Sequence, residues 1–485
     1  MRNLFVMALL ASTTVSLAQK AAKPDAYAKT ITAADLKKHL YIIAGPEMEG
    51  REATTEGERK AAAYIENEFK RIGLQPGNNG SYRQFFPVYR DSLVNVTLEI
   101  NGNKFQLDQD FNTSLANIPA MHAFSEAVYI GSNVSNDSLR SMDLTGRLVI
   151  ASGTVQGRND ILRLKAPAAI FTVSSMFPRK TPAPRTGNMT MQLFKKSIGP
   201  QQFTISENVA RAIVGNNYES IKTSTGARTV NANILTEVHK GTTILQSSNV
   251  IGVLPGTDLK DEYLVITAHY DHEGKRGDSV IYYGADDDGS GTVSVIELAE
   301  AFAKAKKEGK GPRRSIVFMT VSGEEKGLWG SAYYGANPIY PLEKTTANLN
   351  IDMIGRIDPK RTKGDSTNYV YVVGDDKLSS DLRKISEAQN NKYVKLELDY
   401  KYNDPDDKEF IYYRSDHYNF AKYGVPIIFY FNGTHADYHR PTDTPDKINY
   451  DLMEKRAKLI FYTAWDMANR NEMLKRDLPL PVLRR

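Results

Sequence analysis

The segment from Val265 to His272 constrains the fold of this chain more than any other. An apolar run, Val265-Ile-Thr-Ala268, leads directly into His-Tyr-Asp-His, so a predicted buried strand ends in two imidazoles and a carboxylate. Three blocks rich in carboxylates follow it: Gly284–Gly291 with three consecutive aspartates, Ser322–Glu325 with two glutamates, and Asn350–Asp352. Burying such groups requires partners for them, so the blocks are expected to meet in one place.

From about residue 245 the sequence alternates between strand and helix patterns. Predicted strands cover 262–268, 314–321, 347–354, 369–373 and 425–431, and predicted helices cover 292–307, 377–389 and 451–469. This alternation predicts an α/β fold with a mostly parallel central sheet sandwiched by helices. Ligands of such sheets bind beyond the carboxyl ends of the strands. The ionisable blocks fall at those ends.

Residues 115–235 differ from the rest of the chain. They contain strand-like pieces around polar turns and no cluster of ionisable groups, which predicts a separate β-rich insert. We therefore expect a signal peptide at 1–18, a main domain built from 19–114 and 236–485, and the insert at 115–235. The second part of the main domain carries the ionisable blocks.

The first residues are typical of a secretory signal peptide. Arg2 precedes an apolar run over residues 4–17, and Ser16-Leu17-Ala18 resembles a cleavage site. The run is shorter than the roughly 20 residues that a spanning helix needs. The chain contains no cysteine, which excludes disulfides and a lipid-anchored cysteine. We expect a periplasmic or extracellular protein.

Composition excludes several classes of partner. Among 485 residues, 41% are hydrophobic and 25% charged, as in ordinary folded proteins. The net charge of +5 arises from 62 basic and 57 acidic residues. So small an excess favours neither a nucleic-acid partner nor stable membrane association. The sequence leaves the oligomeric state open.

The first two blocks contain candidate metal ligands. In His269-Tyr-Asp271, residues two apart on a strand point the same way, so His269 can bind a metal while Asp271 orients it. Asp286, Asp287 and Asp288 repel one another unless a cation compensates them. One of the three is expected to bridge metals, and a neighbour to cap the helix that follows. We expect His272 to be a neighbouring polar residue.

The remaining blocks complete the candidate set. Two adjacent glutamates, Glu324 and Glu325, can divide their work, one binding metal and the other acting as general base. Asp352 lies in an apolar strand and needs a cation or a salt-bridge partner. His439 lies in a loop, and it is a candidate ligand only in combination with the other residues of this set.

Together these residues favour a site for two metal ions. Two imidazoles and three carboxylates, with one bound hydroxide, would balance two divalent cations held about 3.5–4 Å apart. Nitrogen and oxygen ligands without thiols suit zinc, and they also suit cobalt and manganese.

The chain resembles the secreted co-catalytic di-zinc aminopeptidases, within the superfamily that includes glutamate carboxypeptidase-like enzymes. The resemblance rests on five blocks in order: Glu49–Glu52, Asn249–Gly256, His269–His272, Gly284–Gly291 and Gly323–Ser331. It implies the fold of zinc exopeptidases, also described as phosphorylase/hydrolase-like, and a protease-associated domain as the insert. It also implies one zinc held by His269 and Asp352, a second held by Glu325 and His439, and Asp287 as the bridge.

The resemblance further implies a mechanism. Glu324 would act as general base on a metal-bridged water that attacks the substrate carbonyl, and Asp271 would be the partner of His269. The activity implied is removal of the N-terminal residue from a peptide. For the substrate-binding cleft we expect Asp416, His417 and Tyr430.

Three other functions stay open. A glutamate carboxypeptidase-like exopeptidase would need a basic residue for the terminal carboxylate, and Arg414 is a candidate. A single-zinc glutaminyl cyclase would need Asp287, Glu325 and His439 but neither His269 nor Asp352 as ligands. A binding module without catalysis should have lost ligands or Glu324, and all are present.

Overall fold

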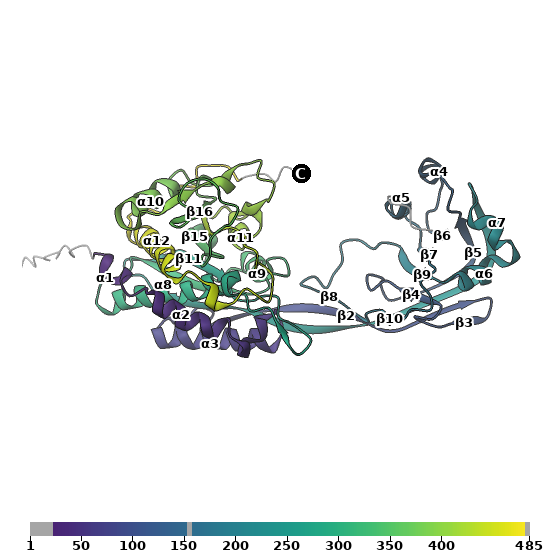
Figure 1. Ribbon diagram of the computed structural model, residues 1–485, viewed down its shortest axis with the longest axis horizontal. Helices are drawn as coiled ribbons and strands as arrows, with labels where there is room; N and C mark the ends of the chain where they lie inside the picture. The colour runs from purple at the N-terminus through teal and green to yellow at the C-terminus, as the bar shows by residue number, and fades with distance from the viewer. Residues whose placement is uncertain (1–22, 153–157, 481–485) are drawn as a thin grey trace, which may run out of the picture. The chain divides into compact units, whose positions relative to one another are not determined.

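The computed structural model describes residues 23–152 and 158–480. The chain forms two compact units (Figure 1), one built up to Phe85 and from Ser247 onward, the other from Phe86 to Gln246. The predicted signal peptide, residues 1–18, lies outside the described residues. Among the helices of the described part, none is long and apolar enough to cross a membrane.

The first unit is built on a mostly parallel sheet. The order of its strands is β17–β16–β18–β15–β11–β14–β10, with β1 at the edge on β10. Their bounds are β1 Gln75–Pro76, β10 Ala227–Leu254, β11 Leu259–His269, β14 Arg314–Val321, β15 Thr345–Ile351, β16 Tyr369–Val373, β17 Glu397–Asp399 and β18 Ile427–Phe431. Strands β18, β15, β11 and β14 are parallel neighbours. Strand β10 runs antiparallel to β14, and β16 runs antiparallel to β18 but parallel to β17. The predicted α/β class is confirmed.

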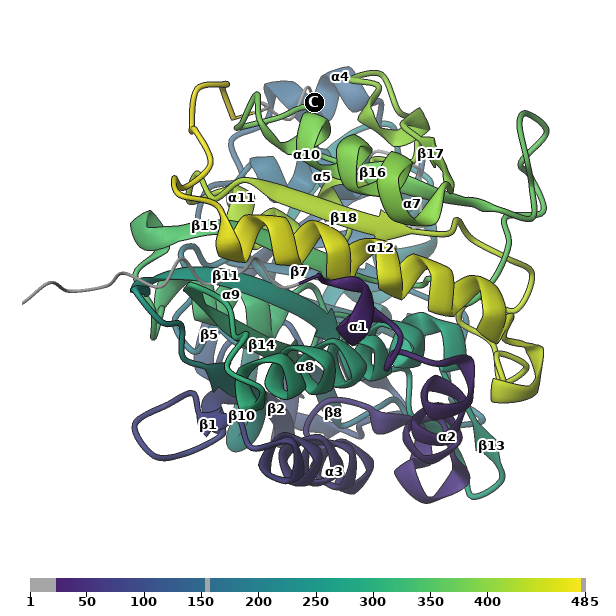
Figure 2. The same ribbon diagram turned by 90° about the vertical axis from the view of Figure 1, so that its left-hand side faces the viewer.

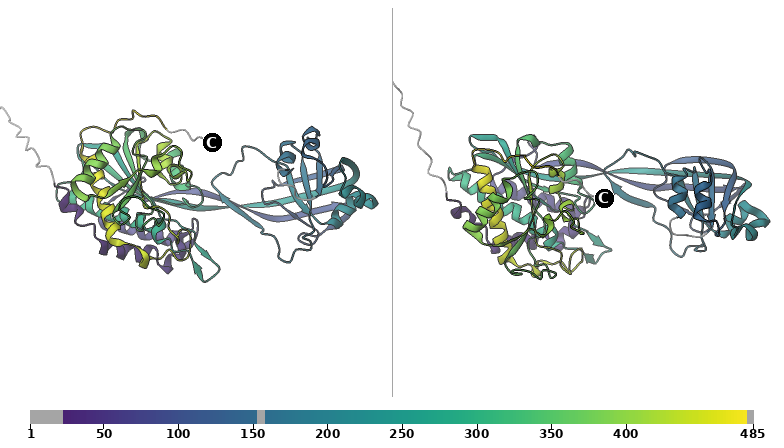
Figure 3. Two further views of the ribbon diagram at one scale, coloured as in Figure 1. Left: turned by 45° about the horizontal axis from the view of Figure 1, so that its top comes forward. Right: turned by 90° about the horizontal axis from the view of Figure 1, so that it is seen from above.

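Helices cover both faces of this sheet. Their bounds are α1 Asp25–Ala28, α2 Ala33–Ile43, α3 Glu56–Ile72, α8 Gly291–Lys307, α9 Trp329–Ala336, α10 Leu382–Gln389, α11 His417–Ala421 and α12 Tyr450–Asn469. Alternate residues of β11 enter two cores: Leu264 and Ile266 pack with α2, α3, α8 and α12, while Val265 packs with α9 and α11. Figure 2 shows α8 and α12 lying across one face, and α12 is the yellow helix in both views of Figure 3.

Local sequence signals explain several helix ends. Helix α3 begins at Glu56, because the Thr55 side chain accepts a hydrogen bond from the Glu58 N–H. It ends at Gly73, whose φ of 89° only glycine adopts at low cost. The helix predicted from residue 377 begins only at Leu382, since Leu378 has a left-handed φ of 64°.

The second unit has its own sheet. Strands β5, β6, β7 and β9 lie in this order in parallel, and β4 and β10 flank them antiparallel. The bounds in this unit are β2 Arg83–Ile100, β3 Asn103–Phe105, β4 Phe111–Thr113, β5 Ala120–Ile130, α4 Asn136–Ser141, β6 Leu148–Ser152, α5 Arg158–Leu164, β7 Ala169–Val173, β8 Thr186–Thr190, β9 Gln201–Ile205, α6 Glu207–Val214 and α7 Tyr218–Lys222. The insert predicted at 115–235 lies inside this unit. The unit begins earlier because β2 pairs with β3 and β8, and β4 pairs with β9.

Arg51 holds three segments of the first unit together. Its guanidinium is fully buried at the end of the short helix η1 (Pro46–Arg51). It donates hydrogen bonds of 2.7–2.9 Å to the backbone carbonyl oxygens of four residues: Ile43, Tyr270, Tyr283 and Gly284. Burial lowers the pKa of Arg51 to about 10, so the group stays charged at neutral pH. The end of α2, the end of β11 and the turn before α8 are thereby fixed to one cation.

A second buried polar group joins α2, α3 and α8. The carboxyl of Glu297 lies 3.5 Å from His39 Nε2, and His39 Nδ1 lies 2.6 Å from the hydroxyl of Tyr64. Burial, with Asp35 and Glu300 nearby, raises the pKa of Glu297 to about 8. The folded protein therefore keeps a proton on Glu297 that the unfolded chain loses above its ordinary pKa of 4.5.

Replacing Arg51 should destabilise the first unit. In Arg51→Gln the shorter neutral side chain leaves buried carbonyl oxygens without donors, and we expect a loss of about 3 kcal/mol or more. Urea and thermal unfolding of the whole chain would measure it. The exposed Arg59→Gln, on the next helix, is the matched control and should change stability by less than about 0.5 kcal/mol. Equal unfolding curves for the two variants would contradict the role given to Arg51.

Replacing Glu297 should change how stability depends on pH. Because its folded pKa is raised, the native state loses stability as pH rises from about 4.5 to 8. Glu297→Gln carries no proton to lose, so we expect it to be more stable than the parent at pH 8 and above. Near pH 4.5 the two proteins should differ less. Thermal unfolding midpoints from pH 5 to pH 9 would test this, and parallel curves would refute it.

Candidate metal centre

The ionisable blocks meet at the carboxyl ends of the central strands. His269 is the last residue of β11 and lies beside Val321, the last residue of β14. Glu324 and Glu325 follow β14 after a turn, and Asp352 comes directly after β15. Parallel neighbours end at the same edge of a sheet, so strand order alone brings these side chains together.

A first set of ligand atoms surrounds His269. Its Nε2 lies 3.3 Å from Asp287 Oδ1 and 3.7 Å from Asp352 Oδ1. All three residues are buried, and ligand atoms of the set lie within 4.8 Å of one another. The other ring nitrogen of His269 helps to orient the ring, because Nδ1 lies 3.1 Å from the backbone carbonyl oxygen of Asp271.

A second set surrounds Glu325. His439 Nε2 lies 3.0 Å from both Glu325 Oε2 and Asp287 Oδ2. His272 Nδ1 lies 2.7 Å from Glu325 Oε1 and 3.8 Å from Asp287 Oδ2. Asp287 thus turns one oxygen to each set. This is the arrangement in which one carboxylate can bridge two ions.

The unsatisfied atoms in this cluster fit a cation. Several buried polar atoms have no hydrogen-bond partner: His269 Nε2, both ring nitrogens of His272, Asp287 Oδ2 and Glu325 Oε1. Leaving such atoms buried and unpaired is costly, and each is a nitrogen or oxygen of the kind that binds metal ions. Imidazoles and carboxylates are the ligands that zinc takes in proteins. The residues present are therefore suitable ligands for zinc.

The other two aspartates of the turn accept hydrogen bonds from backbone N–H groups and do not face the ligand sets. Asp288 accepts hydrogen bonds from the N–H groups of His269, Gly291 and Met353 at 2.8–3.1 Å. Asp286 accepts one from Gly355 N at 2.6 Å. These contacts lock the turn η3 (Ala285–Ser290) so that Asp287 alone of the three faces both sets.

Asp443 is a part of the site that sequence reasoning missed. Its Oδ2 accepts hydrogen bonds from the backbone N–H groups of Asp286 and Asp287, at 2.9 and 3.2 Å. Its place four residues after His439 was a signal, but its partners lie more than 150 residues away in sequence. Ser415 was missed in the same way: its hydroxyl donates to Asp352 Oδ2 at 2.6 Å.

Glu324 lies beside the ligand sets and lines a pocket. Its Oε2 is 3.9 Å from His269 Nε2, and its backbone N–H donates to Asp271 Oδ1 at 3.1 Å. The Asp271 carboxylate therefore positions the glutamate turn, whereas its backbone carbonyl contacts His269. Burial raises the pKa of Glu324 well above its usual value, although His269 opposes this. The pocket is lined by Asp287, Glu324, Asp352, Met353, Ile411, Arg414, Phe429, Phe431, Thr434 and Tyr438.

The residues predicted to bind substrate do not line this pocket. Tyr430 belongs to the core beneath α12, with its hydroxyl near Ser386 and Thr463, because neighbouring residues of a strand face opposite sides of the sheet. The ring of His417 is fully buried against Phe429.

Asp416 is also fully buried and lies behind the ligand sets. Its Oδ1 accepts a hydrogen bond from the Ser331 hydroxyl at 2.5 Å, and burial raises its pKa to about 7. Phe429 and Phe431, on either side of Tyr430 in β18, face the pocket instead.

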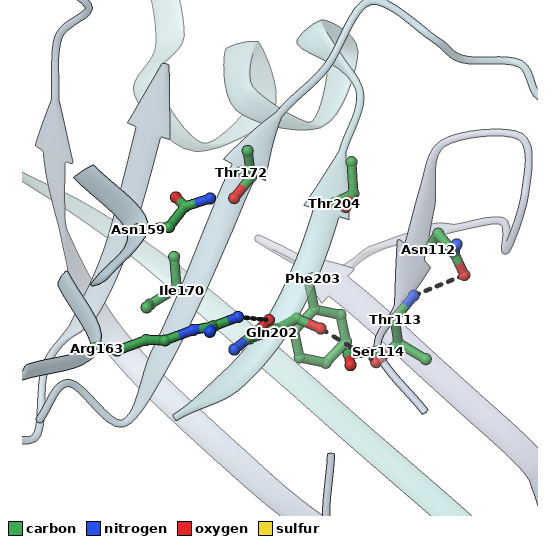
Figure 4. A pocket seen from close by; sticks show the side chains of 10 residues that line it. All are labelled: Asn112, Thr113, Ser114, Asn159, Arg163, Ile170, Thr172, Gln202, Phe203 and Thr204. Carbon is green, nitrogen blue, oxygen red and sulfur yellow. Dashed lines mark hydrogen bonds between the residues drawn. The ribbon is translucent and has the colours of Figure 1, made fainter. Parts of the chain in front are cut away.

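The second unit offers no comparable chemistry among its described residues. A hollow of about 210 Å³ is lined by residues of α5 and of the strands β7, β9 and β4. Figure 4 shows these side chains. The lining of the hollow consists of Asn112, Thr113, Ser114, Asn159, Arg163, Ile170, Thr172, Gln202, Phe203 and Thr204. This set contains neither a histidine nor a carboxylate, so the metal-ligating groups of interest are those of the first unit.

Known proteins resemble the part of the chain that builds the centre. Residues 249–464 match the model of Peptidase family M28. A probable zinc metalloprotease of Pyricularia oryzae is 30% identical over 265 residues, covering 46% of this chain and 50% of that protein. Leucine aminopeptidase 1 of Penicillium rubens is 26% identical over 229 residues, covering 45% and 56%. The chain spans about half the length of these two relatives.

A solved structure resembles the fold. The aminopeptidase from Aneurinibacillus sp. strain AM-1 superimposes with a TM-score of 0.54 at 19% identity, covering 95% of this chain and 99% of that one. Such a likeness supports the zinc exopeptidase fold. Residues 249–464, the part of the chain that matches the model of Peptidase family M28, supply the histidines and carboxylates of the centre.

Proposed function

We propose that this chain is an aminopeptidase that uses two zinc ions to remove the N-terminal residue of a peptide. One ion would be held by His269 and Asp352, the other by Glu325 and His439, with Asp287 between them. The observation that carries the proposal is that the two carboxylate oxygens of Asp287 face separate sets of ligand atoms. A structural ion pair would need only one such partner.

The chemistry follows from the position of Glu324. When bound, zinc supplies a Lewis acid for the scissile carbonyl and lowers the pKa of water in the site. Glu324 accepts the proton of the attacking water and later delivers it to the leaving amine. Because burial raises its pKa, Glu324 is a stronger proton acceptor than an exposed glutamate, which favours the first step. Asp271 keeps the turn of Glu324 in place through its backbone N–H.

The pocket beside Glu324 supports cleavage of a terminal residue. Met353, Ile411, Phe429 and Phe431 offer apolar contacts to one side chain of the substrate. The carboxylates around it favour a cationic group, such as a free α-amine.

Arg414 favours a second candidate function. It lines the same pocket, and its guanidinium donates to the Tyr438 hydroxyl at 3.2 Å. A guanidinium in this position could bind a terminal carboxylate, as a glutamate carboxypeptidase-like enzyme requires. The acidic surroundings favour an amine, so we place this function second.

Cleavage of aminoacyl chromogenic amides would test the proposal. We expect the zinc-loaded protein to cut substrates with a free amine and to leave N-acetylated ones intact. Glu324→Gln should lower the rate by about 10²-fold or more, because the general base is lost. Removal of zinc by a chelator should have a comparable effect. The exposed Glu343→Gln is the control and should cut at the parent rate.

Two results would oppose this proposal. Cleavage of acetylated substrates that end in a free acidic residue would favour the carboxypeptidase alternative. A Glu324→Gln protein as active as the parent would remove Glu324 from the mechanism.

Zinc affinity should depend on pH through His439. Burial alone would lower its pKa, but the carboxylates of Asp287 and Glu325 outweigh burial and raise it to about 10 in the metal-free protein. Zinc binds neutral imidazole, so this proton must leave on binding. We expect affinity to rise by up to roughly tenfold per pH unit between about pH 6.5 and 9. Competition with a chromophoric chelator would measure it, and an affinity independent of pH would contradict the ligand role of His439.

A further inference from the structure

His272 has a position that packing alone does not explain. Its side chain is fully buried, and neither ring nitrogen has a hydrogen-bond partner. Even so, Nδ1 lies 2.7 Å from Glu325 Oε1. The contact has the length of an ion pair, but it does not meet the angular requirements of a hydrogen bond. An imidazole nitrogen and a carboxylate oxygen are also the atom types that bind zinc.

The distances around His272 agree with a shared ion. Zinc bonds of about 2.0–2.1 Å in a tetrahedral site place ligand atoms about 3.3 Å apart. The separations among His272, His439, Glu325 and Asp287 run from 2.7 to 3.8 Å. The imidazoles of His272 and His439 meet edge to face, with ring centroids 5.8 Å apart. Both rings therefore reach the carboxylates of Asp287 and Glu325: they share Asp287 Oδ2 and contact different oxygens of Glu325.

The chain leaves room for this imidazole. Gly284, with a φ of 55°, lies directly against the ring: a Cβ there would come within 2.5 Å of His272 Cγ. The backbone N–H of His272 donates to the Arg51 carbonyl oxygen at 3.3 Å, which fixes the base of the side chain. A glycine and a buried backbone contact thus hold the ring toward Glu325.

Glu273 is the rival for the same position. It forms a set with Glu325 and His439, and its carboxylate could approach an ion there. Its Oε2 already accepts a hydrogen bond of 2.9 Å from Arg276. His272 is the more buried of the two and has no competing partner for its nitrogens.

We propose that His272 is a direct ligand of the zinc ion held by Glu325 and His439. This inference rests on the proposed two-zinc centre. The second ion would have two imidazoles and two carboxylates, which fills a tetrahedral site. The first ion would have one imidazole and two carboxylates, His269, Asp352 and Asp287, and so would keep a position for substrate. The second ion is therefore the tighter one, and the first is the one that exchanges.

A chelator titration of the whole chain tests this assignment. Zinc per chain is measured after dialysis against graded chelator, for the parent, His272→Phe and His417→Phe. We expect the parent to lose its ions in two separated steps. His272→Phe keeps a ring against Gly284 but removes the nitrogens, and its tight ion should dissociate at least tenfold more readily. The control His417→Phe, also a fully buried histidine, should behave as the parent.

A second variant guards against misfolding. His272→Ala removes the ring, and added imidazole should restore much of its zinc affinity by occupying the space left. The absorption spectrum of the cobalt-loaded proteins should change in both His272 variants, since a nitrogen ligand is lost. Metal-free unfolding curves show whether each variant is folded.

The outcomes separate this inference from the proposed function. A parent that binds fewer than two zinc ions overturns the two-zinc centre itself. A parent with two ions, together with a His272→Phe protein whose chelator profile and cobalt spectrum match the parent, overturns the ligand role of His272 alone. Two ions in the parent and weakened retention of one ion in both His272 variants establish it.

Discussion

Burying negative charge at the carboxyl ends of the central strands is the constraint on which the rest of the structure depends. Asp271, Asp286, Asp287 and Asp288 are at most 2% exposed. Carboxylates that lie so close together and are buried away from water repel one another unless cations face them. Arg51 supplies one fixed positive charge, and three of these acids, Asp271, Asp287 and Asp288, lie close enough to raise its pKa. Divalent ions between the two ligand sets would supply the remainder, which ties stability of the site to metal binding.

The three aspartates of the turn between β11 and α8 have different roles, which the backbone geometry of the turn determines. Asp288 and Asp286 accept hydrogen bonds from N–H groups of distant segments, and Asp443 accepts those of the turn itself. With the backbone so held, Asp287 has one orientation available, between the two ligand sets. Glu324 is positioned in the same way, because its backbone N–H donates a hydrogen bond to the carboxylate of Asp271. In this way carboxylates that do not face the pocket position those that do.

The two ligand sets differ in a way that bears on function. The set around Glu325 is richer in imidazole, whereas the set around Asp352 borders the apolar pocket. An ion with all positions filled by protein serves to hold the site, and an ion with a free position serves the substrate. Glu324 lies beside the second kind, near His269. The proposed chemistry and the proposed ligand role of His272 both follow from this asymmetry.

The sequence by itself determined the class of fold and the residue types of the centre. Strand–helix alternation predicted the parallel sheet, and the blocks around His269, Asp287, Glu325 and Asp352 were visible because each is local. Only the tertiary structure decided what depends on distant contacts. It showed that Asp287 rather than its neighbours lies between the ligand sets, that Tyr430 faces the wrong side of β18, and that Asp443 supports the turn. It also brought His272 to Glu325. The local sequence shows which residue types can build the centre. The direction and the partners of each side chain depend on packing between segments far apart in the chain.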